Sequence, residues 1–224
     1  MKRILIALLV GGLYPFFGEA AGDPLWSIGT IDKSDAEFAG SKSEIQVVGD
    51  IASSANVVYM VGLSMPSGWL NMQPGPADAW ASNKEHCCVV LFDLQTGFPS
   101  TGNCTLVLHL KNNHKEVPPR LQIRLNGQDV TEVQLQPGPG DDLMQGKTSE
   151  IPDIHVPIKI PGSMLDKKNV LEINNIQGSW LVYDAVEFFA PTSVKLAFPG
   201  NTPKDEKTVW LLITACVAAH RLRC

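Results

Sequence analysis

Aromatic and amide side chains gather in one long segment of this 224-residue sequence. Residues 64–81 contain two tryptophans, three prolines and two glycines. Proteins bind sugars by stacking an apolar ring face on an aromatic side chain, while amides and carboxylates hold the hydroxyls. The segment therefore predicts a carbohydrate-binding loop with five contact residues: Trp69, Asn71, Gln73, Asp78 and Trp80. The alternative is that its tryptophans close one end of a packed core.

No catalytic residue is assigned. The sequence has no nucleophile elbow, no glycine loop that would hold phosphate and no His-x-x-x-His pair. Four of its five histidines lie scattered through the middle of the chain, and each is expected to be a surface residue or a hydrogen-bonded core residue: His86, His109, His114 and His155. A polysaccharide lyase needs a base and a cation beside a carboxylate, and such residues can lie far apart in a sequence.

No metal ligand is assigned either. Cys87 and Cys88 are adjacent on an expected strand, so their side chains point to opposite faces and cannot grip one ion together with His86. A disulfide from Cys104 to one of them requires that their strands be neighbours. There are five cysteines, so at least one thiol is unpaired or pairs between chains. Asp141-Asp142 is expected to be a solvated turn.

Composition excludes several classes of partner. The formal net charge is −5 and the pI is about 5.5, so there is no basic surplus for nucleic acid or an anionic membrane. Hydrophobic residues make up 44% and charged residues 18%, which permits a sizeable core. With 19 glycines and 16 prolines, the chain is expected to be rich in turns.

Apolar and polar residues alternate with period two in the middle of the chain, which is typical of half-buried strands. One side of the last strand is expected to carry Trp180, Val182, Asp184, Val186 and Phe188. Asn126-Gly127 predicts a hairpin turn, Pro157 disfavours an inner strand, and residues 32–38 are expected to form one helical turn. The expected strands cover residues 57–61, 87–92, 104–110, 121–125, 130–135, 154–160, 171–173 and 180–189. The predicted fold is an all-β antiparallel sandwich of the jelly-roll type.

The two ends of the chain differ from the middle. Lys2 and Arg3 precede an apolar stretch over residues 4–17 and then small residues, which predicts a cleaved secretory leader over residues 1–21. The sandwich is expected over residues 22–198. Residues 199–224 are expected to be a linker and an atypical tail, whose apolar run of residues 209–219 is too short to span a bilayer. That tail is either a docked helix or the point where a longer protein was cut. Secretion, a periplasmic site or the cell surface follows from the leader.

Four segments in order resemble the third domain of rhamnogalacturonan lyases, polysaccharide lyase family four. They are LWSIGTIDKSDAEF at residues 25–38, QPGPADAW at 73–80, LNG at 125–127 and GSWLVYDAVEF at 178–188. The resemblance implies a galactose-binding-like jelly roll and a carbohydrate-binding role, with catalytic residues in a different domain that no segment here matches. Modules of this kind often carry a structural calcium ion, for which no ligand set is assigned, so no cofactor is expected.

The residues of these segments are expected to determine the fold rather than to bind a ligand. Trp26, Ile28 and Phe38 are expected in the core, Gly29 and Gly127 at special backbone angles, and Asp32 and Asp184 as acceptors for loop amides.

The sequence therefore predicts an exported, non-catalytic module that binds a polysaccharide or oligosaccharide. Its expected role is accessory to the degradation of pectin or rhamnogalacturonan, within a longer protein that carries the catalytic domain. Two alternatives stay open: a small lyase or hydrolase in its own right, and a structural interaction domain at the cell surface.

Overall fold

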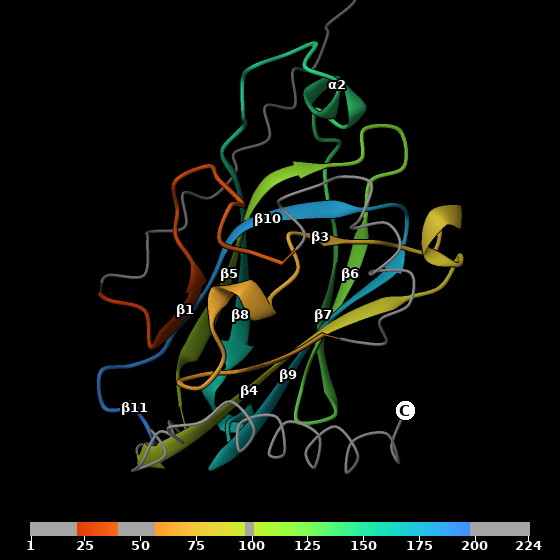
Figure 1. Cartoon of the computed structure of the whole chain (residues 1–224). Coiled ribbons are helices and arrows are strands. Elements are labelled where there is room, and N and C mark those ends of the chain that lie inside the picture. Colours follow the sequence, from red (N-terminus) through yellow and green to blue (C-terminus); the bar gives the residue numbers. More distant parts are fainter. Residues whose placement is uncertain (1–21, 40–56, 97–100, 198–224) are drawn as a thin grey trace, which may run out of the picture.

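Two β-sheets packed face to face contain nearly all regular structure of the computed structural model, which describes residues 22–39, 57–96 and 101–197 (Figure 1). The expected leader over residues 1–21 and the tail over residues 199–224 lie outside the described residues. The predicted β-sandwich is confirmed.

The first sheet runs in the order β1-β10-β5-β8, and β3 also pairs with β10. All of its pairs are antiparallel. Its strands are β1 (Trp26–Gly29), β3 (Met72–Gln73), β5 (Asn103–Asn113), β8 (Ile154–Pro161) and β10 (Leu181–Phe189). Among the described strands, β8 lies at the edge and pairs only with β5, which suits Pro157 because proline has no amide to donate to a second neighbour.

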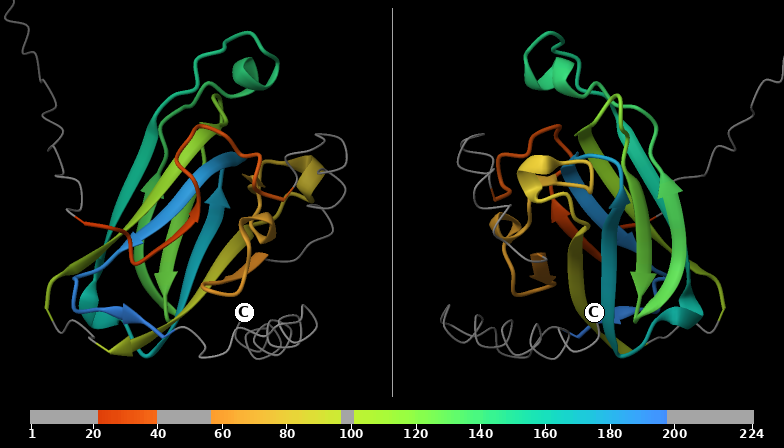
Figure 2. Two further views of the ribbon diagram at one scale, coloured as in Figure 1. Left: turned by 60° about the vertical axis from the view of Figure 1, so that its left-hand side comes forward. Right: turned by 90° about the vertical axis from the view of Figure 1, so that its right-hand side faces the viewer.

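The second sheet runs in the order β11-β4-β9-β6-β7, and β2 pairs with β4. The β2–β4 pair is parallel, which the sequence did not predict. The strands are β2 (Val57–Met60), β4 (His86–Thr96), β6 (Arg120–Leu125), β7 (Gln128–Gln134), β9 (Lys168–Gln177) and β11 (Lys195–Leu196). Helical structure among the described residues is limited to four short pieces: η1 (Pro66–Gly68), η2 (Ala79–Ala81), α2 (Asp141–Met144) and η3 (Gly162–Met164). Figure 2 shows the two layers from the side.

Three aromatic rings join the two layers inside the core. Trp26 of β1 stacks on Phe188 of β10 with ring centroids 5.3 Å apart, and Phe92 of β4 lies 5.6 Å from Trp26 and 5.3 Å from Phe188. All three side chains are buried. Burying an aromatic side chain removes about 150–250 Å² from water, which is about 4–6 kcal/mol of transfer free energy for each ring. The core thus forms where alternating apolar residues of both sheets meet.

The hairpin predicted at Asn126-Gly127 is confirmed. Both residues have positive φ, 54° and 76°, as a two-residue turn between β6 and β7 requires. Asn126 also accepts a hydrogen bond from the amide of Val170 through its side-chain oxygen, at 2.9 Å. The turn is therefore fastened to the neighbouring strand β9.

The helical turn predicted over residues 32–38 is present as a single hydrogen-bonded turn, in which the amide of Phe38 donates to the Asp35 carbonyl oxygen at 3.1 Å, and no helix forms. The amide of Ser34 donates to Asp32 Oδ1 at 2.9 Å, and the amide of Ala36 donates to Ser34 Oγ at 3.2 Å. The Ser34 contact is the one that an N-cap side chain makes to the first amides of a turn, but the turn does not continue into a helix. Asp184 accepts hydrogen bonds from the amides of Asp32 and Lys33, which confirms its predicted contact with a loop.

The alternation of core-facing and outward-facing side chains changes partway along β10. A β-bulge between Val182 and Ala185 shifts the register of β10 against β5. Leu181 and Tyr183 face the core before the bulge, and Val186 and Phe188 face it afterwards. The prediction that Val182 shares a face with Val186 is therefore wrong, because a bulge inserts one extra residue and reverses the alternation.

Gly29 and Gly127 form a matched pair for testing backbone strain against packing. Both have positive φ, 80° and 76°, but a Cβ at Gly29 would meet Phe38 Cζ at 2.4 Å, whereas a Cβ at Gly127 meets no atom within 4 Å. We expect Gly127→Ala to lower the free energy of unfolding by about 1–2 kcal/mol from strain alone. Gly29→Ala should lower it by about 2–5 kcal/mol, because overpacking adds to the strain. Urea unfolding of both variants measures the difference, and equal losses would contradict the packing role of Gly29.

Candidate functional site

Trp69 lies inside the core. Its side chain is 0% exposed, and its ring meets Tyr59 and Tyr183 edge to face, with centroids 6.0 and 5.5 Å away. A stacked sugar needs an open ring face, so the prediction that Trp69 contacts a ligand is wrong in this fold. Trp69 instead closes one end of the packed core, which was the alternative interpretation of the loop tryptophans.

Gln73 is also fully buried and serves as a cross-link. Its Nε2 donates to the carbonyl oxygens of His86 at 2.7 Å and Ile173 at 2.9 Å, and its Oε1 accepts from the Tyr183 hydroxyl. His86 and Ile173 belong to β4 and β9, whereas Tyr183 belongs to β10. The amide therefore joins the two sheets and has no group left for a ligand.

Asp78 fastens the loop to the turn before β10. Its Oδ2 accepts from the amide of Gly75 at 2.8 Å and its Oδ1 accepts from the Ser179 hydroxyl. The loop lies so close that a Cβ at Gly75 would be 2.5 Å from the Gly178 carbonyl oxygen. Asp78 is 5% exposed, so its predicted contact with a sugar is replaced by this structural role.

Asn71 is held among charged neighbours. Its Nδ2 donates to Asp35 Oδ2 at 3.2 Å, and Asp35 Oδ1 pairs with Lys111 Nζ at 2.7 Å. The side chain is 8% exposed, and its Oδ1 has no hydrogen-bond partner within the described part of the chain. Asn71 is thus part of the attachment of residues 32–38 to the first sheet, rather than of an open binding surface.

Of the five predicted contact residues, Trp80 alone keeps a partly open side chain. It lies on η2, and the loop that follows it is exposed at residues 82–85. Asn83 Nδ2 donates to the Pro76 carbonyl oxygen at 3.1 Å, which holds this end of the loop. Trp80 therefore stays a predicted ligand contact.

A hollow of about 430 Å³ opens at another part of the sandwich. One wall is the segment before β1, residues 22–25, and the other is the connection from the end of β10 to β11, residues 189–196. The two segments, red and blue in Figure 1, lie on the same side of the molecule. Phe189 lines the hollow and is half-buried, and the polar side chains there are Asp23, Thr192 and Lys195.

Among the Phe, Tyr and Trp residues that the structure describes, Phe189 and Trp80 are partly exposed and all the others are buried. The hollow has the volume and mixed lining of a small-molecule site, for which about 300–1,000 Å³ is usual. Sequence reasoning missed it because its two walls are about 165 residues apart in the chain, as the span from Asp23 to Phe189 shows.

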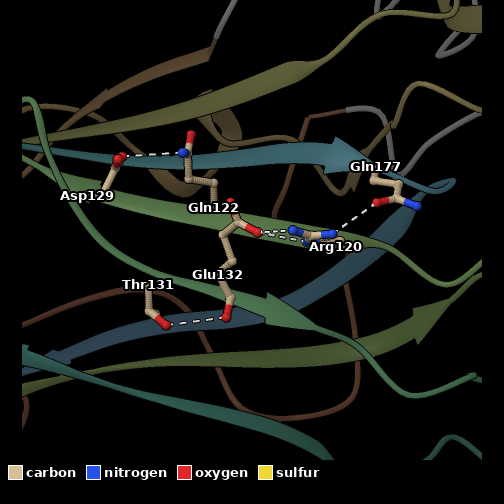
Figure 3. A network of polar contacts seen from close by, with 6 residues as sticks. All are labelled: Arg120, Gln122, Asp129, Thr131, Glu132 and Gln177. Atoms are coloured by element: carbon tan, nitrogen blue, oxygen red, sulfur yellow. Dashed lines mark hydrogen bonds and ion pairs between the residues drawn. The ribbon is translucent and has the colours of Figure 1, made fainter.

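The outer face of β6, β7 and β9 carries a polar network (Figure 3). Arg120 Nε donates to Glu132 Oε2 at 2.8 Å, Arg120 Nη1 donates to Gln177 Oε1 at 3.3 Å, and Gln122 Nε2 donates to Asp129 Oδ1 at 3.3 Å. These groups suit sugar hydroxyls, but they already bind one another. None of the three strands contains an aromatic residue, so this face offers no ring for stacking.

The buried thiols and phenol are unreactive. Burial raises the pKa of Cys104 to about 11, and it raises the pKa values of Cys88 and Tyr183 well above their usual range. These groups therefore stay protonated near neutral pH and offer no nucleophile. Cys104 is on β5 of the first sheet and Cys88 on β4 of the second, and no disulfide joins them.

The four histidines that the structure describes fall into two groups. His86 Nε2 lies 3.1 Å from the Ala81 carbonyl oxygen, and His114 Nδ1 accepts from the amide of Val117 at 3.0 Å, so both have the structural roles expected of them. His109 and His155, by contrast, are brought together on β5 and β8.

No group of three or more His, Cys, Asp and Glu side chains in the described ranges could hold a metal ion. Likewise, none of the helices described has the length and apolarity to cross a membrane.

Comparison with known families matches residues 24–188 to the family described as CBM-like, polysaccharide lyase family 4, domain III. A search of curated proteins gives no match.

Three solved structures resemble part of the chain. A family 35 carbohydrate-binding module from an environmental isolate is 12% identical with a TM-score of 0.34, over 49% of this chain and 70% of that one. An insecticidal delta-endotoxin from Bacillus thuringiensis is 11% identical with a TM-score of 0.35, over 53% and 23%. A family GH115 4-O-methyl-α-glucuronidase with specificity for decorated arabinogalactans is 15% identical with a TM-score of 0.32, over 49% and 14%. Likeness at this level carries no argument about ligands.

The different burial of the two loop tryptophans gives a direct test. We expect Trp69→Ala to lower the free energy of unfolding by about 3–5 kcal/mol, because it empties a site inside the core. Trp80→Ala should cost about 1 kcal/mol, since its side chain is only half-buried. Urea denaturation of both variants checks this, and a stable Trp69→Ala protein would show that the ring is not a core element.

Proposed function

This chain belongs to the CBM-like family of polysaccharide lyase family 4, domain III, and we propose that it binds carbohydrate as the accessory module of an exported, polysaccharide-degrading protein. In this proposal the bonds of the glycan are broken by a separate domain. The predicted leader supports export, and the match to a CBM-like domain supports the accessory role.

The observation that carries the proposal is the hollow that Phe189 lines. A partly exposed aromatic ring in a concave site with mixed apolar and polar lining can accept the apolar face of a pyranose ring. Asp23 and Thr192 offer oxygen atoms that can bind sugar hydroxyl groups. The hollow thus combines a ring for stacking with polar groups for orientation.

Lys195 suggests an acidic glycan of the pectic type. Lys195 lines the hollow, is exposed and forms no ion pair with any described residue, so its ammonium is available to the carboxylate of a uronic acid. The net charge of −5 opposes a polyanion at long range. Screening over about 8 Å at physiological ionic strength weakens that repulsion. The short-range contact with Lys195 therefore outweighs the net charge in the binding of an acidic glycan.

Affinity is expected to be weak, about micromolar to millimolar in dissociation constant, because an open site buries few contacts to offset the ordering of a glycan chain. The hollow contains no tryptophan, so calorimetry is a better measurement than intrinsic fluorescence.

We expect Phe189→Ala to abolish binding of pectic oligosaccharides and Lys195→Gln to weaken binding of uronate-containing glycans at least threefold, while leaving neutral glycans unaffected. Isothermal titration of each variant measures both effects, with circular dichroism to confirm folding. Trp80→Ala removes the other half-open ring, which the loop sequence predicts as a ligand contact, and so compares the loop with the hollow: unchanged binding in this variant, together with loss in Phe189→Ala, locates the site at the hollow.

Loss of binding in Trp80→Ala, with Phe189→Ala unchanged, would place the site on the predicted loop instead. A wild-type protein that binds no glycan would favour the alternative of a structural spacer.

A further inference from the structure

Two histidines meet across neighbouring strands of the first sheet. His109 on β5 is directly opposite His155 on β8 in the strand register. Their Nδ1 atoms lie 2.8 Å apart, and the two rings are nearly perpendicular, at 89° with centroids 4.8 Å apart. The His155 side chain is 43% exposed and that of His109 is 9% exposed, so the pair is open to solvent on one side.

Each ring is fixed by a carboxylate at its other nitrogen. His109 Nε2 is 2.9 Å from Glu187 Oε2, and His155 Nε2 is 2.7 Å from Asp153 Oδ1. An ionised carboxylate can only accept hydrogen bonds, so both rings must donate from Nε2. A neutral imidazole with its proton on Nε2 has a lone pair on Nδ1.

The two Nδ1 atoms face one another at 2.8 Å, so either one proton shared as N–H···N or a bound cation joins them. The surrounding charges favour a cation, because the carboxylates of Glu187 and Asp153 contact the rings and Asp184 interacts electrostatically with His109. Lys33 adds one positive charge near Asp153. Metal-ligating histidines in proteins have this same arrangement, with the second ring nitrogen donating to a carboxylate.

We propose that His109 and His155 bind a divalent transition-metal ion, Cu²⁺ in preference to Ni²⁺ and Zn²⁺, through their two Nδ1 atoms. With a metal–nitrogen bond of about 2.0–2.1 Å, two neighbouring positions of a square-planar or tetragonal site are about 2.9 Å apart, whereas tetrahedral positions are about 3.3 Å apart. The observed 2.8 Å fits the tetragonal arrangement. Copper(II) adopts that geometry and also has the highest affinity for nitrogen ligands in the divalent series.

Water completes the coordination. Among the described residues, the protein ligands of the proposed site are the two histidines, since no group of three or more His, Cys, Asp or Glu side chains there could hold an ion. The His155 side chain is 43% exposed, so in this proposal its ring turns until both lone pairs converge on one point. The bound ion would join the edge strand β8 to β5, so it should stabilise the fold by mass action. This site is independent of the proposed glycan site.

The test is titration of the metal-free, full-length chain with Cu²⁺, followed by calorimetry and electron paramagnetic resonance. We expect a tetragonal spectrum with hyperfine structure from two imidazole nitrogens, and a melting temperature that rises with Cu²⁺. His155→Gln and His109→Gln should each weaken binding at least tenfold and remove the two-nitrogen pattern. Asp153→Asn should weaken it about tenfold by loosening the ring that it orients.

His114→Gln is the matched control, because His114 is a structural histidine whose loss leaves the pair intact. It should bind Cu²⁺ as the wild type does. If His155→Gln keeps the same affinity and spectrum while circular dichroism shows it folded, the proposal is overturned, and a shared proton is what holds the two rings together.

Discussion

The buried amide of Gln73 is the interaction on which the arrangement of the long loop depends. It bonds to the carbonyl oxygens of two strands in the second sheet and to the Tyr183 hydroxyl in the first. A buried polar group left without a partner costs about 1–3 kcal/mol, so this amide has one position in which all of its groups are satisfied. That position places β3 beside β10 and fixes the loop on both sides of it.

Because the loop is fixed in this position, the Trp69 ring and the polar side chains of the loop pack inside the protein and are not open to a ligand. With β3 held against β10, Trp69 lies between Tyr59 and Tyr183, and Asp78 reaches the Ser179 hydroxyl. The same residue types that suit a sugar also suit a buried polar cross-link, because both need amides, carboxylates and aromatic faces. Their chemistry alone does not distinguish the two uses, and burial does. The open aromatic ring with a concave surface around it is Phe189, at the junction of the described start of the chain and the β10–β11 connection.

The pairing of neighbouring strands creates the contact between His109 and His155. His109 and His155 are far apart in the chain, but the antiparallel pairing of β5 with β8 sets them opposite one another, and β10 supplies Glu187 from the other side. An edge strand is well suited to such a contact, since one of its sides is open and its outward residues are accessible. The sheet thus assembles a group of ionisable side chains from three strands.

The sequence by itself determined the class of fold, the Asn126-Gly127 turn, the edge position of the strand with Pro157 and the core roles of Trp26, Ile28 and Phe38. These features follow from local rules: side-chain alternation, the backbone freedom of glycine and the missing amide of proline. Only the tertiary structure decided the burial of Trp69 and Gln73, the bulge that reverses β10, and the meeting of His109 with His155. Each of these depends on which strands become neighbours and in what register, and such long-range pairing is not encoded in the spacing of residues within one segment.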